Sequence, residues 1–274
     1  MRTLLVALLL AVLTVPAGAV VRGETSRDPN GLRATVVRVE NADGELCSGA
    51  LIAPDLVLTA AHCVLQRSLY RIVALDRSFR FRTVGASQVA VHPAFVPGTT
   101  PRGQPGVDLA LIRLDRGIGA DFIPLDPAAA VSVGIGEPLV LAGFGVTAEG
   151  RSKTARTLRQ ADLVALGTLQ VANRVLVGVD PERFATRAGA GACRGDSGGP
   201  ILRREGGGYR LLGVVSWSSG AFEERRPGAC GGYTAITPVA DHMAWITGQA
   251  ALMSAYGPGG AVSRLPPVQD WTVR

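Results

Sequence analysis

The sequence predicts an all-β fold that ends in a single α-helix. Short runs of valine, leucine and isoleucine alternate with glycine, proline, aspartate and asparagine, a pattern typical of strands separated by turns. A long helical periodicity first appears at Val239 to Met253, near the C-terminus. With 274 residues, 47% of them hydrophobic, the chain can bury one large all-β domain or two small ones.

The first 19 residues are typical of a secretory signal peptide. Arg2 precedes an apolar run from Leu4 to Val15, and small residues follow, with Ala17 and Ala19 in the places that signal peptidase prefers. The apolar stretch is short for a membrane span and contains proline and glycine. We therefore expect cleavage after Ala19, a secreted, periplasmic or extracellular location, and no membrane association of the mature chain.

Eight segments of the mature chain are predicted strands, because each is rich in branched apolar residues and bounded by turn residues. The small residues between Asp126 and Pro138 suit a crossing between two similar halves. The last segment, Gly257 to Arg274, is rich in glycine and proline, and we expect it to be disordered. The predicted strands are Ala34–Val39, Leu56–Thr59, Tyr70–Leu75, Leu109–Leu114, Leu139–Ala142, Leu163–Leu166, Arg174–Val179 and Leu211–Trp217.

Four cysteines in a secreted chain suggest two disulfide bonds. The count allows three pairings and does not choose among them. The sequence contains no Cys-x-x-Cys motif, so a zinc site is not expected. We expect no metal and no cofactor.

The formal net charge of +6 comes almost entirely from arginine, because Lys153 is the one lysine among 28 basic residues. The arginines are scattered along the chain, with short pairs such as Arg203-Arg204. A nucleic-acid-binding protein would more often gather them into a stripe with aromatic residues, which make up only 5% here. Nucleic acid is therefore not an expected partner.

Three motifs contain the residue types that acyl transfer by a serine requires. "LTAAHCV" contains His62, "GVDLALIRL" contains Asp108 and "GDSGGP" contains Ser197. The nucleophile needs a base to take its proton, a carboxylate to orient that base, and donors for the developing oxyanion. A lone histidine or aspartate of this kind has a purely structural explanation, whereas "GDSGGP" alone is already fairly specific. Together, and in this order, they predict a catalytic triad.

The nucleophile motif overlaps a second one, because Arg194 to Ser197 spells RGDS, a tetrapeptide that cell-adhesion receptors bind. Receptor binding requires Arg194 and Asp196 to be exposed. The protease interpretation requires Asp196 to be buried. The exposure of Asp196 therefore decides between the two hypotheses.

From about Val20 to about Gly248 the sequence resembles the chymotrypsin-like serine endopeptidases, the S1 family with the trypsin fold. The similar segments are "CSGALIAPDLVLTAAHC", "DLALIRL", "LAGFG", "GDSGGP" and "LLGVVSWSS". The resemblance implies two packed six-stranded antiparallel β-barrels, over about 20–130 and 131–250, with a tail over 251–274. It also implies a secreted, bacterial-type member that acts as a monomer on protein or peptide substrates.

The resemblance implies which residues form the site. His62 and Asp108 from the first barrel and Ser197 from the second would form the triad. The backbone N–H groups of Gly195 and Ser197 would form the oxyanion hole. The family pattern also pairs Cys47 with Cys63 and Cys193 with Cys230, and assigns substrate binding to Gly191, Ala192, Arg194, Ser216, Trp217 and Ser218.

The sequence departs from the trypsin-like pattern in the specificity pocket. Gly191 stands six residues before the nucleophile, where trypsin-like members have an aspartate that binds arginine or lysine. With Ala192 beside it and Ser218 on the wall, the pocket predicts cleavage after an uncharged residue, small or medium aliphatic, with an aromatic as second choice. Glu223 or Glu224, in a long loop, could still bring a negative charge to this pocket. No carboxylate cluster follows the predicted base, so the calcium loop of some members is not expected.

In this family a new N-terminus made by proteolysis folds inward and pairs with the aspartate before the nucleophile. Here "VVRGE", starting at Val20, is similar to that terminus, with Arg22 where glycine or asparagine is commoner. It begins directly after Ala19. We therefore predict that signal-peptide removal itself activates the protein, with the α-ammonium of Val20 paired to Asp196.

Two further hypotheses come from other functional classes. The complete set of triad motifs argues against a catalytically silent homologue that binds a partner. The predicted burial of Asp196 argues against an adhesion module. The sequence favours an active, secreted serine endopeptidase.

Overall fold

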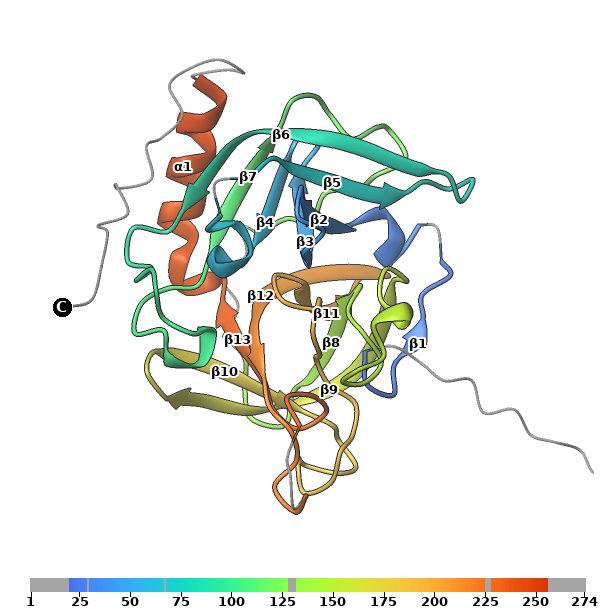
Figure 1. Ribbon diagram of the computed structural model, residues 1–274, viewed down its shortest axis with the longest axis vertical. Helices are drawn as coiled ribbons and strands as arrows, with labels where there is room; N and C mark the ends of the chain where they lie inside the picture. The colour runs from blue at the N-terminus through green and yellow to red at the C-terminus, as the bar shows by residue number, and fades with distance from the viewer. Residues whose placement is uncertain (1–19, 29, 67, 128–131, 225–227, 256–274) are drawn as a thin grey trace, which may run out of the picture.

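The computed structural model describes residues 20–28, 30–66, 68–127, 132–224 and 228–255. Two β-barrels pack against each other, and one helix near the C-terminus lies beside β7 of the first barrel (Figure 1). The predicted all-β fold, with two six-stranded antiparallel barrels and one C-terminal helix, is confirmed. The predicted signal peptide (1–19) lies outside the described residues.

The first barrel closes in the order β2-β3-β4-β7-β6-β5, with every pair antiparallel. Side chains alternate across the strands, so Val37 and Val39 join Ile72 in the barrel core while Arg38 and Glu40 lie on the opposite face of β2. The strands are β2 (Val36–Asn41), β3 (Leu46–Ala53), β4 (Leu56–Thr59), β5 (Tyr70–Leu75), β6 (Phe81–Val91) and β7 (Ala110–Leu114).

The second barrel runs β8-β9-β10-β13-β12-β11 and closes by pairing β11 with β8. Leu139, Leu163 and Ile236 are fully or nearly fully buried in its core. A short additional strand, β1, pairs with β9 and brings the start of the described chain onto this barrel. The strands are β1 (Glu24–Thr25), β8 (Pro138–Gly143), β9 (Arg159–Gln170), β10 (Arg174–Val179), β11 (Pro200–Glu205), β12 (Gly208–Ser218) and β13 (Thr234–Pro238).

The helical elements are short except at the C-terminus. The predicted helix begins at Met243, because Ala240 to His242 form a 3-10 turn, and it ends at Ala255. The predicted domain end at 250 therefore falls inside this helix, and residues 256–274 lie outside the described part of the chain. The helical elements are η1 (Leu32–Ala34), η2 (Ala61–Val64), η3 (Pro101–Gly103), η4 (Ser152–Thr154), η5 (Ala240–His242) and α1 (Met243–Ala255).

Both predicted disulfides are present. Cys47–Cys63 joins β3 to η2, and Cys193–Cys230 joins the loop before β11 to the loop before β13. Closing a loop of the first bridge's size stabilises a fold by about 3 kcal/mol in the chain-entropy account. In the described part of the chain, no helix is long and apolar enough to span a membrane.

Candidate active site

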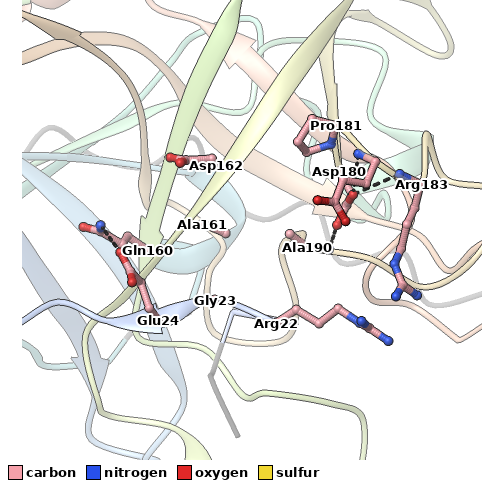
Figure 2. Close-up of a pocket in the computed structure, with 11 residues that line it drawn as sticks. Arg22, Gly23, Glu24, Gln160, Ala161, Asp162, Asp180, Pro181, Arg183 and Ala190 are labelled. Carbon is pink, nitrogen blue, oxygen red and sulfur yellow. Dashed lines mark hydrogen bonds between the residues drawn. The ribbon is translucent and has the colours of Figure 1, made fainter. Parts of the chain in front are cut away.

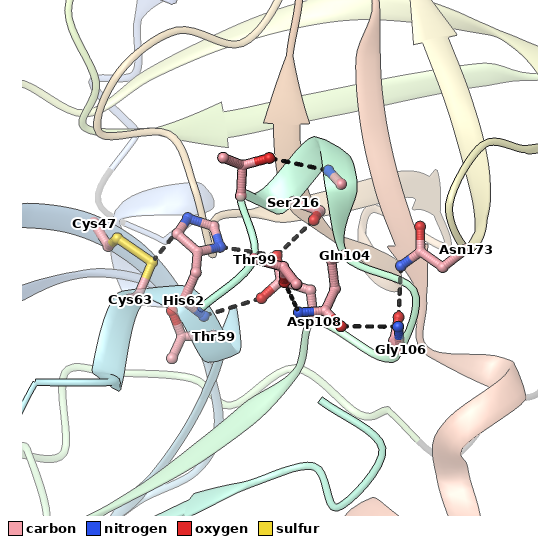
Figure 3. A network of polar contacts seen from close by, with 12 residues as sticks. Cys47, Thr59, His62, Cys63, Thr99, Gln104, Gly106, Asp108, Asn173 and Ser216 are labelled. Atoms are coloured by element: carbon pink, nitrogen blue, oxygen red, sulfur yellow. Dashed lines mark hydrogen bonds and ion pairs between the residues drawn. A yellow bond between two sulfur atoms is a disulfide. The ribbon is translucent and has the colours of Figure 1, made fainter. Parts of the chain in front are cut away.

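Asp108 holds His62 through two hydrogen bonds (Figure 3). Its Oδ2 lies 2.8 Å from Nδ1 of the imidazole, and its Oδ1 accepts from the backbone N–H of His62 at 3.0 Å. The hydroxyl of Ser216 donates to the same Oδ2 at 2.5 Å. Asp108 is fully buried, whereas the His62 side chain is 17% exposed. The carboxylate therefore fixes an imidazole that remains accessible.

The hydrogen bonds decide the charge of Asp108. Burial by itself would raise the pKa of this carboxyl, but the bonds from His62 and Ser216 outweigh burial and lower its pKa below the usual value. Asp108 is therefore ionised at neutral pH and accepts a hydrogen bond from the Nδ1–H of His62. The other ring nitrogen, Nε2, lies 3.8 Å from Cys63 Sγ.

Local structure explains how these groups meet. His62 lies in η2, directly after β4, and its neighbour Cys63 is bound to β3 by the disulfide. The register between β12 and β13 shifts between Val215 and Trp217, which is a β-bulge at Ser216. A bulge re-aims one side chain, and here it directs the Ser216 hydroxyl to Asp108.

Ser197 lies where the two barrels meet. Its carbonyl oxygen accepts from the backbone N–H of Ser48 at 2.8 Å. A Cβ on the next residue, Gly198, would collide with Thr59 Oγ1, so glycine permits this close contact. Within the described residues, Ser197 Oγ makes no hydrogen bond to His62. Catalytic hydrogen bonds are often long in ligand-free enzymes and shorten when substrate binds.

Ser48 orients the peptide group of Gly195. Its hydroxyl donates to the Gly195 carbonyl at 2.8 Å and accepts from the backbone N–H of Phe144 at 2.9 Å. Gly195 has a φ of 93°, and a Cβ there would lie 3.0 Å from Gly145 Cα. Among the hydrogen bonds of the described chain, the N–H groups of Gly195 and Ser197 are not donors. The two N–H groups are thus available to an incoming oxyanion.

Asp196 is fully buried, and its carboxylate accepts from two backbone N–H groups. Gly145 donates to Oδ1 at 2.8 Å and Cys193 donates to Oδ2 at 2.9 Å. Burial raises the pKa of Asp196 to about 7, although both N–H groups act to lower it. Arg194 is exposed. A buried Asp196 cannot reach a receptor, which excludes the adhesion hypothesis.

The start of the described chain is inserted beside the nucleophile loop. Val20 is fully buried and packs with Ala190 and Ala192. Val21 exchanges two backbone hydrogen bonds with Gly191, at 3.1 and 3.3 Å. Val20 has a φ of 55°, a left-handed conformation that a β-branched residue rarely adopts.

A cavity of about 430 Å³ adjoins this segment (Figure 2). Arg22 to Glu24 form one wall, and Asp180 lies on another, where its carboxylate accepts from the backbone N–H groups of Glu182, Arg183 and Ala190. Asp180 therefore stabilises a turn, and no triad residue lines this cavity.

Gly191 and Ala192 have uncharged partners, whereas the carboxylate of Glu149 accepts from the backbone N–H of Ala229 beside Ser218. Gly191 and Ala192 are buried, and the N–H of Ala192 donates to Thr234 Oγ1 at 3.0 Å. Ser218 donates to the carbonyl of Ala229 in the long loop, at 2.6 Å. Glu223, which could have charged the pocket, instead lies 3.6 Å from Arg187.

Sequence reasoning missed one loop at this site. Arg102, in η3, is exposed, and its guanidinium lies 5.4 Å from the ring centroid of Trp217, a predicted substrate-binding residue. Buried Gln104 holds the loop by bonding Val96 and Gly106 (Figure 3 shows Gln104). No motif marks a glutamine of this kind, because its partners are all backbone atoms and a threonine hydroxyl within the same loop.

A family model described as "Trypsin" matches residues 20–246. The chain belongs to the trypsin family. This membership makes it a serine endopeptidase, which is a hydrolase, and agrees with the two-barrel fold and with the contact between His62 and Asp108.

The relatives of this trypsin-family chain include several animal proteins. Lectizyme of Glossina austeni is 29% identical over 222 residues, with 74% of this chain and 77% of the relative covered. Chymotrypsin-like elastase family member 1 of Felis catus is 28% identical over 214 residues, covering 73% and 77%. Coagulation factor XII of Cavia porcellus is 29% identical over 229 residues, and the match spans 73% of this chain but only 36% of that protein. These relatives do not support the expected bacterial-type member.

A similar solved structure is that of human heparin binding protein. Its TM-score is 0.65 at 24% identity, with 88% of this chain and 100% of that chain covered. At this identity the likeness shows a shared fold.

Proposed function

We propose that this trypsin-family chain is a secreted endopeptidase that cleaves peptide bonds through His62, Asp108 and Ser197 and an acyl-enzyme. One observation carries the proposal: a fully buried Asp108 bonds both the ring and the backbone of an accessible His62. An imidazole held in this tautomer presents Nε2 as a general base. Protein or peptide substrates follow from the family, and the chain is proposed to act as a monomer without a cofactor.

In acylation, Ser197 Oγ attacks the scissile carbonyl carbon while His62 Nε2 takes its proton. Asp108 stabilises the imidazolium that forms. The N–H groups of Gly195 and Ser197 bind the negative oxygen of the tetrahedral intermediate. The imidazolium then gives its proton to the leaving amine, and the C–N bond breaks. In deacylation, water takes the place of the amine and the same proton transfers run in reverse.

The proposal includes activation by signal-peptide removal. A cut after Ala19 would leave Val20 with a free α-ammonium beside the nucleophile loop, and that cation would favour the ionised form of Asp196. The burial of both residues supports this pairing, since a buried carboxylate without a paired counter-charge is costly. The cut would also remove the peptide bond that defines φ of Val20, and with it the left-handed strain.

The proposed substrate preference is an uncharged residue before the scissile bond. The uncharged contacts of Gly191 and Ala192, and the pairing of Glu223 with Arg187, support it. Burying an arginine or lysine head group without a counter-charge would be unfavourable. Cleavage-site profiling on a peptide library would show it, and a strong preference for arginine or lysine would contradict it.

The triad is tested by replacing Ser197 and His62 with alanine, singly and together, and measuring peptide hydrolysis. Each single change should remove nearly all activity, and the double change should cost little more, because the residues act as a unit. A Ser197→Ala chain that keeps more than a few per cent of the rate would show that another group is the nucleophile. A silent homologue, the alternative function, would show no difference between the parent chain and these variants.

A further inference from the structure

A second cavity lies away from the catalytic residues, on the side of the first barrel where the β5–β6 hairpin extends past η1 and β1 (Figure 1). Its volume is about 490 Å³. Much of its wall is apolar and comes from segments far apart in sequence, namely Val73, Leu75, Phe79, Phe81, Phe144 and Leu158. No triad residue lines it.

Four arginines complete the wall, and no aspartate or glutamate of the described chain is among its lining residues. Arg33 is only 2% exposed, and its Nε has no hydrogen-bond partner among the described residues. Arg38 is also buried, and burial lowers its pKa. Arg27 and Arg156 are exposed. Buried guanidinium groups beside an apolar cavity form an environment that favours an anion.

Arginines that are scattered in the sequence gather around this cavity. The buried carboxylate of Glu40 lies within 3.4 Å of Arg38, Arg71 and Arg156. The buried carboxylate of Asp76 lies within 3.4 Å of Arg80 and Arg82, and its backbone carbonyl accepts from Arg33. Two carboxylates thus face five arginines, and the side chains of Arg71, Arg80, Arg82 and Arg156 are 48–70% exposed. Positive charge therefore extends well beyond the cavity.

Two phenylalanines are left exposed at this cavity, Phe79 by 63% and Phe81 by 66%. The Arg33 guanidinium carbon lies 3.8 Å from the Phe79 ring centroid, and that of Arg38 lies 5.2 Å from the Phe81 ring centroid. Phe79 has a φ of 59°, a left-handed conformation that is unfavourable for a bulky residue. Exposed aromatic rings held over arginines, at the expense of backbone strain, indicate a binding surface.

We propose that this arginine–phenylalanine site binds an acidic polypeptide segment, with one aromatic or large aliphatic side chain in the cavity and its carboxylates on the surrounding arginines. The apolar wall requires an apolar group, and the spread of exposed arginines requires several negative charges. A sulfated polysaccharide or an anionic membrane would neutralise the arginines without filling the cavity, so a peptide fits the observations better.

The probe is a short fluorescein-labelled peptide in which glutamates flank one phenylalanine. The protein is the mature chain with Ser197→Ala, so that the peptide is not cleaved and binding is measured independently of the proposed catalysis. Fluorescence anisotropy should show saturable binding that weakens as salt is added. Replacing the glutamates of the probe by glutamine, or its phenylalanine by alanine, should each weaken binding by about tenfold or more.

Phe79→Ala and Arg27→Gln, both at exposed positions of the site, should each weaken binding of the acidic probe by about tenfold. Arg174→Gln, at an exposed arginine on β10 of the other barrel, is the matched control and should leave binding unchanged. Circular dichroism should show the same fold in all three variants. The proposal is wrong if Phe79→Ala leaves the affinity unchanged or if the glutamine probe binds equally well. It is also wrong if only dextran sulfate or anionic vesicles bind, with equal affinity for the Phe79→Ala chain.

Discussion

Asp108 and Asp196 are both fully buried, but their pKa values move in opposite directions. Asp108 is bonded to an imidazole and a hydroxyl, and its pKa is lowered. Asp196 accepts from two neutral backbone N–H groups, and its pKa is raised to about 7. Burial is the largest influence on both, so the partners decide the charge.

The difference separates two parts of the proposed machinery. The base and its orienting carboxylate are assembled within the folded chain. In our proposal the loop that carries Gly195 and Ser197 depends on Asp196, and a nearby cation favours the ionised form of that residue. In our proposal the cation is the new N-terminus at Val20. The proposal thus makes catalysis conditional on a cleavage outside the triad.

The largest effect should come from Asp108→Asn. The amide cannot stabilise the imidazolium and favours the wrong tautomer of His62, so kcat should fall by about 10⁴-fold while the fold is kept. Steady-state hydrolysis of a peptide substrate measures this. Asp162→Asn, at a carboxylate that is 64% exposed on β9, is the control and should have no effect. A fall of less than about tenfold would show that Asp108 does not orient the base.

The next effect concerns stability and pH in a chain that still has residues before Val20. The pKa of Asp196 is raised from 3.8 to about 7, so the folded state holds a proton that the unfolded state releases. The stability from this proton is fully present below about pH 4 and is lost as the pH rises to about 7. The lowered pKa of Asp108 has the opposite effect on the stability of the folded state. Its ionised carboxylate stabilises the fold at neutral pH, and this contribution is lost only at more acidic pH.

Urea unfolding across this pH range should therefore show falling stability in the extended chain. The chain that begins at Val20 should lose less stability over the same pH range, because its α-ammonium favours the ionised form of Asp196. Equal pH profiles for the two chains would show that the terminus does not interact with Asp196.

Gly145→Ala should act on the surroundings of Asp196. A Cβ at this position would lie 2.5 Å from Asp196 Cγ and 2.7 Å from the Arg194 carbonyl oxygen. The forced shift should lower the free energy of unfolding by about 1–3 kcal/mol. Gly134→Ala is the matched control, since a Cβ there meets nothing within 4 Å. Equal stability of the two variants would show that the segment around Gly145 can move away from Asp196 without cost.

The smallest effect should come from Ser216→Ala. It removes one charge-assisted hydrogen bond from Asp108 but leaves both bonds to His62, so kcat/KM should fall by about tenfold. Kinetics on a peptide substrate measure this change. A loss as large as that of Asp108→Asn would mean that the hydroxyl, and not the imidazole, governs the carboxylate.

The sequence alone led to the parts of the site that depend on local motifs. His62 and Asp108 come from two such motifs, and they are in contact in the structure. It did not reveal the bonds of Ser48 to Gly195 or of Ser216 to Asp108, which join residues 147 and 108 positions apart. Contacts of this kind exist only after the barrels pack.

The same limit applies to the strands and the charges. All eight predicted strands overlap strands of the structure, and three of them match β4, β5 and β10 in both bounds. The strands β1, β3, β6, β11 and β13 were missed, and in β3 and β6 glycine, serine and other polar residues interrupt the apolar pattern. The arginines are scattered in the sequence, yet antiparallel pairing of β2, β5 and β6 brings Arg38, Arg71 and Arg82 together, and five arginines in all lie at the carboxylates of Glu40 and Asp76.

The most direct test of the account compares two chains, one that begins at Val20 and one with a single extra residue before it. Both should fold, as judged by circular dichroism, and both are treated with a fluorophosphonate that labels an activated serine. The account predicts rapid labelling of Ser197 in the chain that begins at Val20, and labelling slower by about 10²- to 10³-fold in the extended chain, whose oxyanion hole is not ordered. Equal rates in the two chains would contradict the claim that the α-ammonium of Val20 activates the site through Asp196.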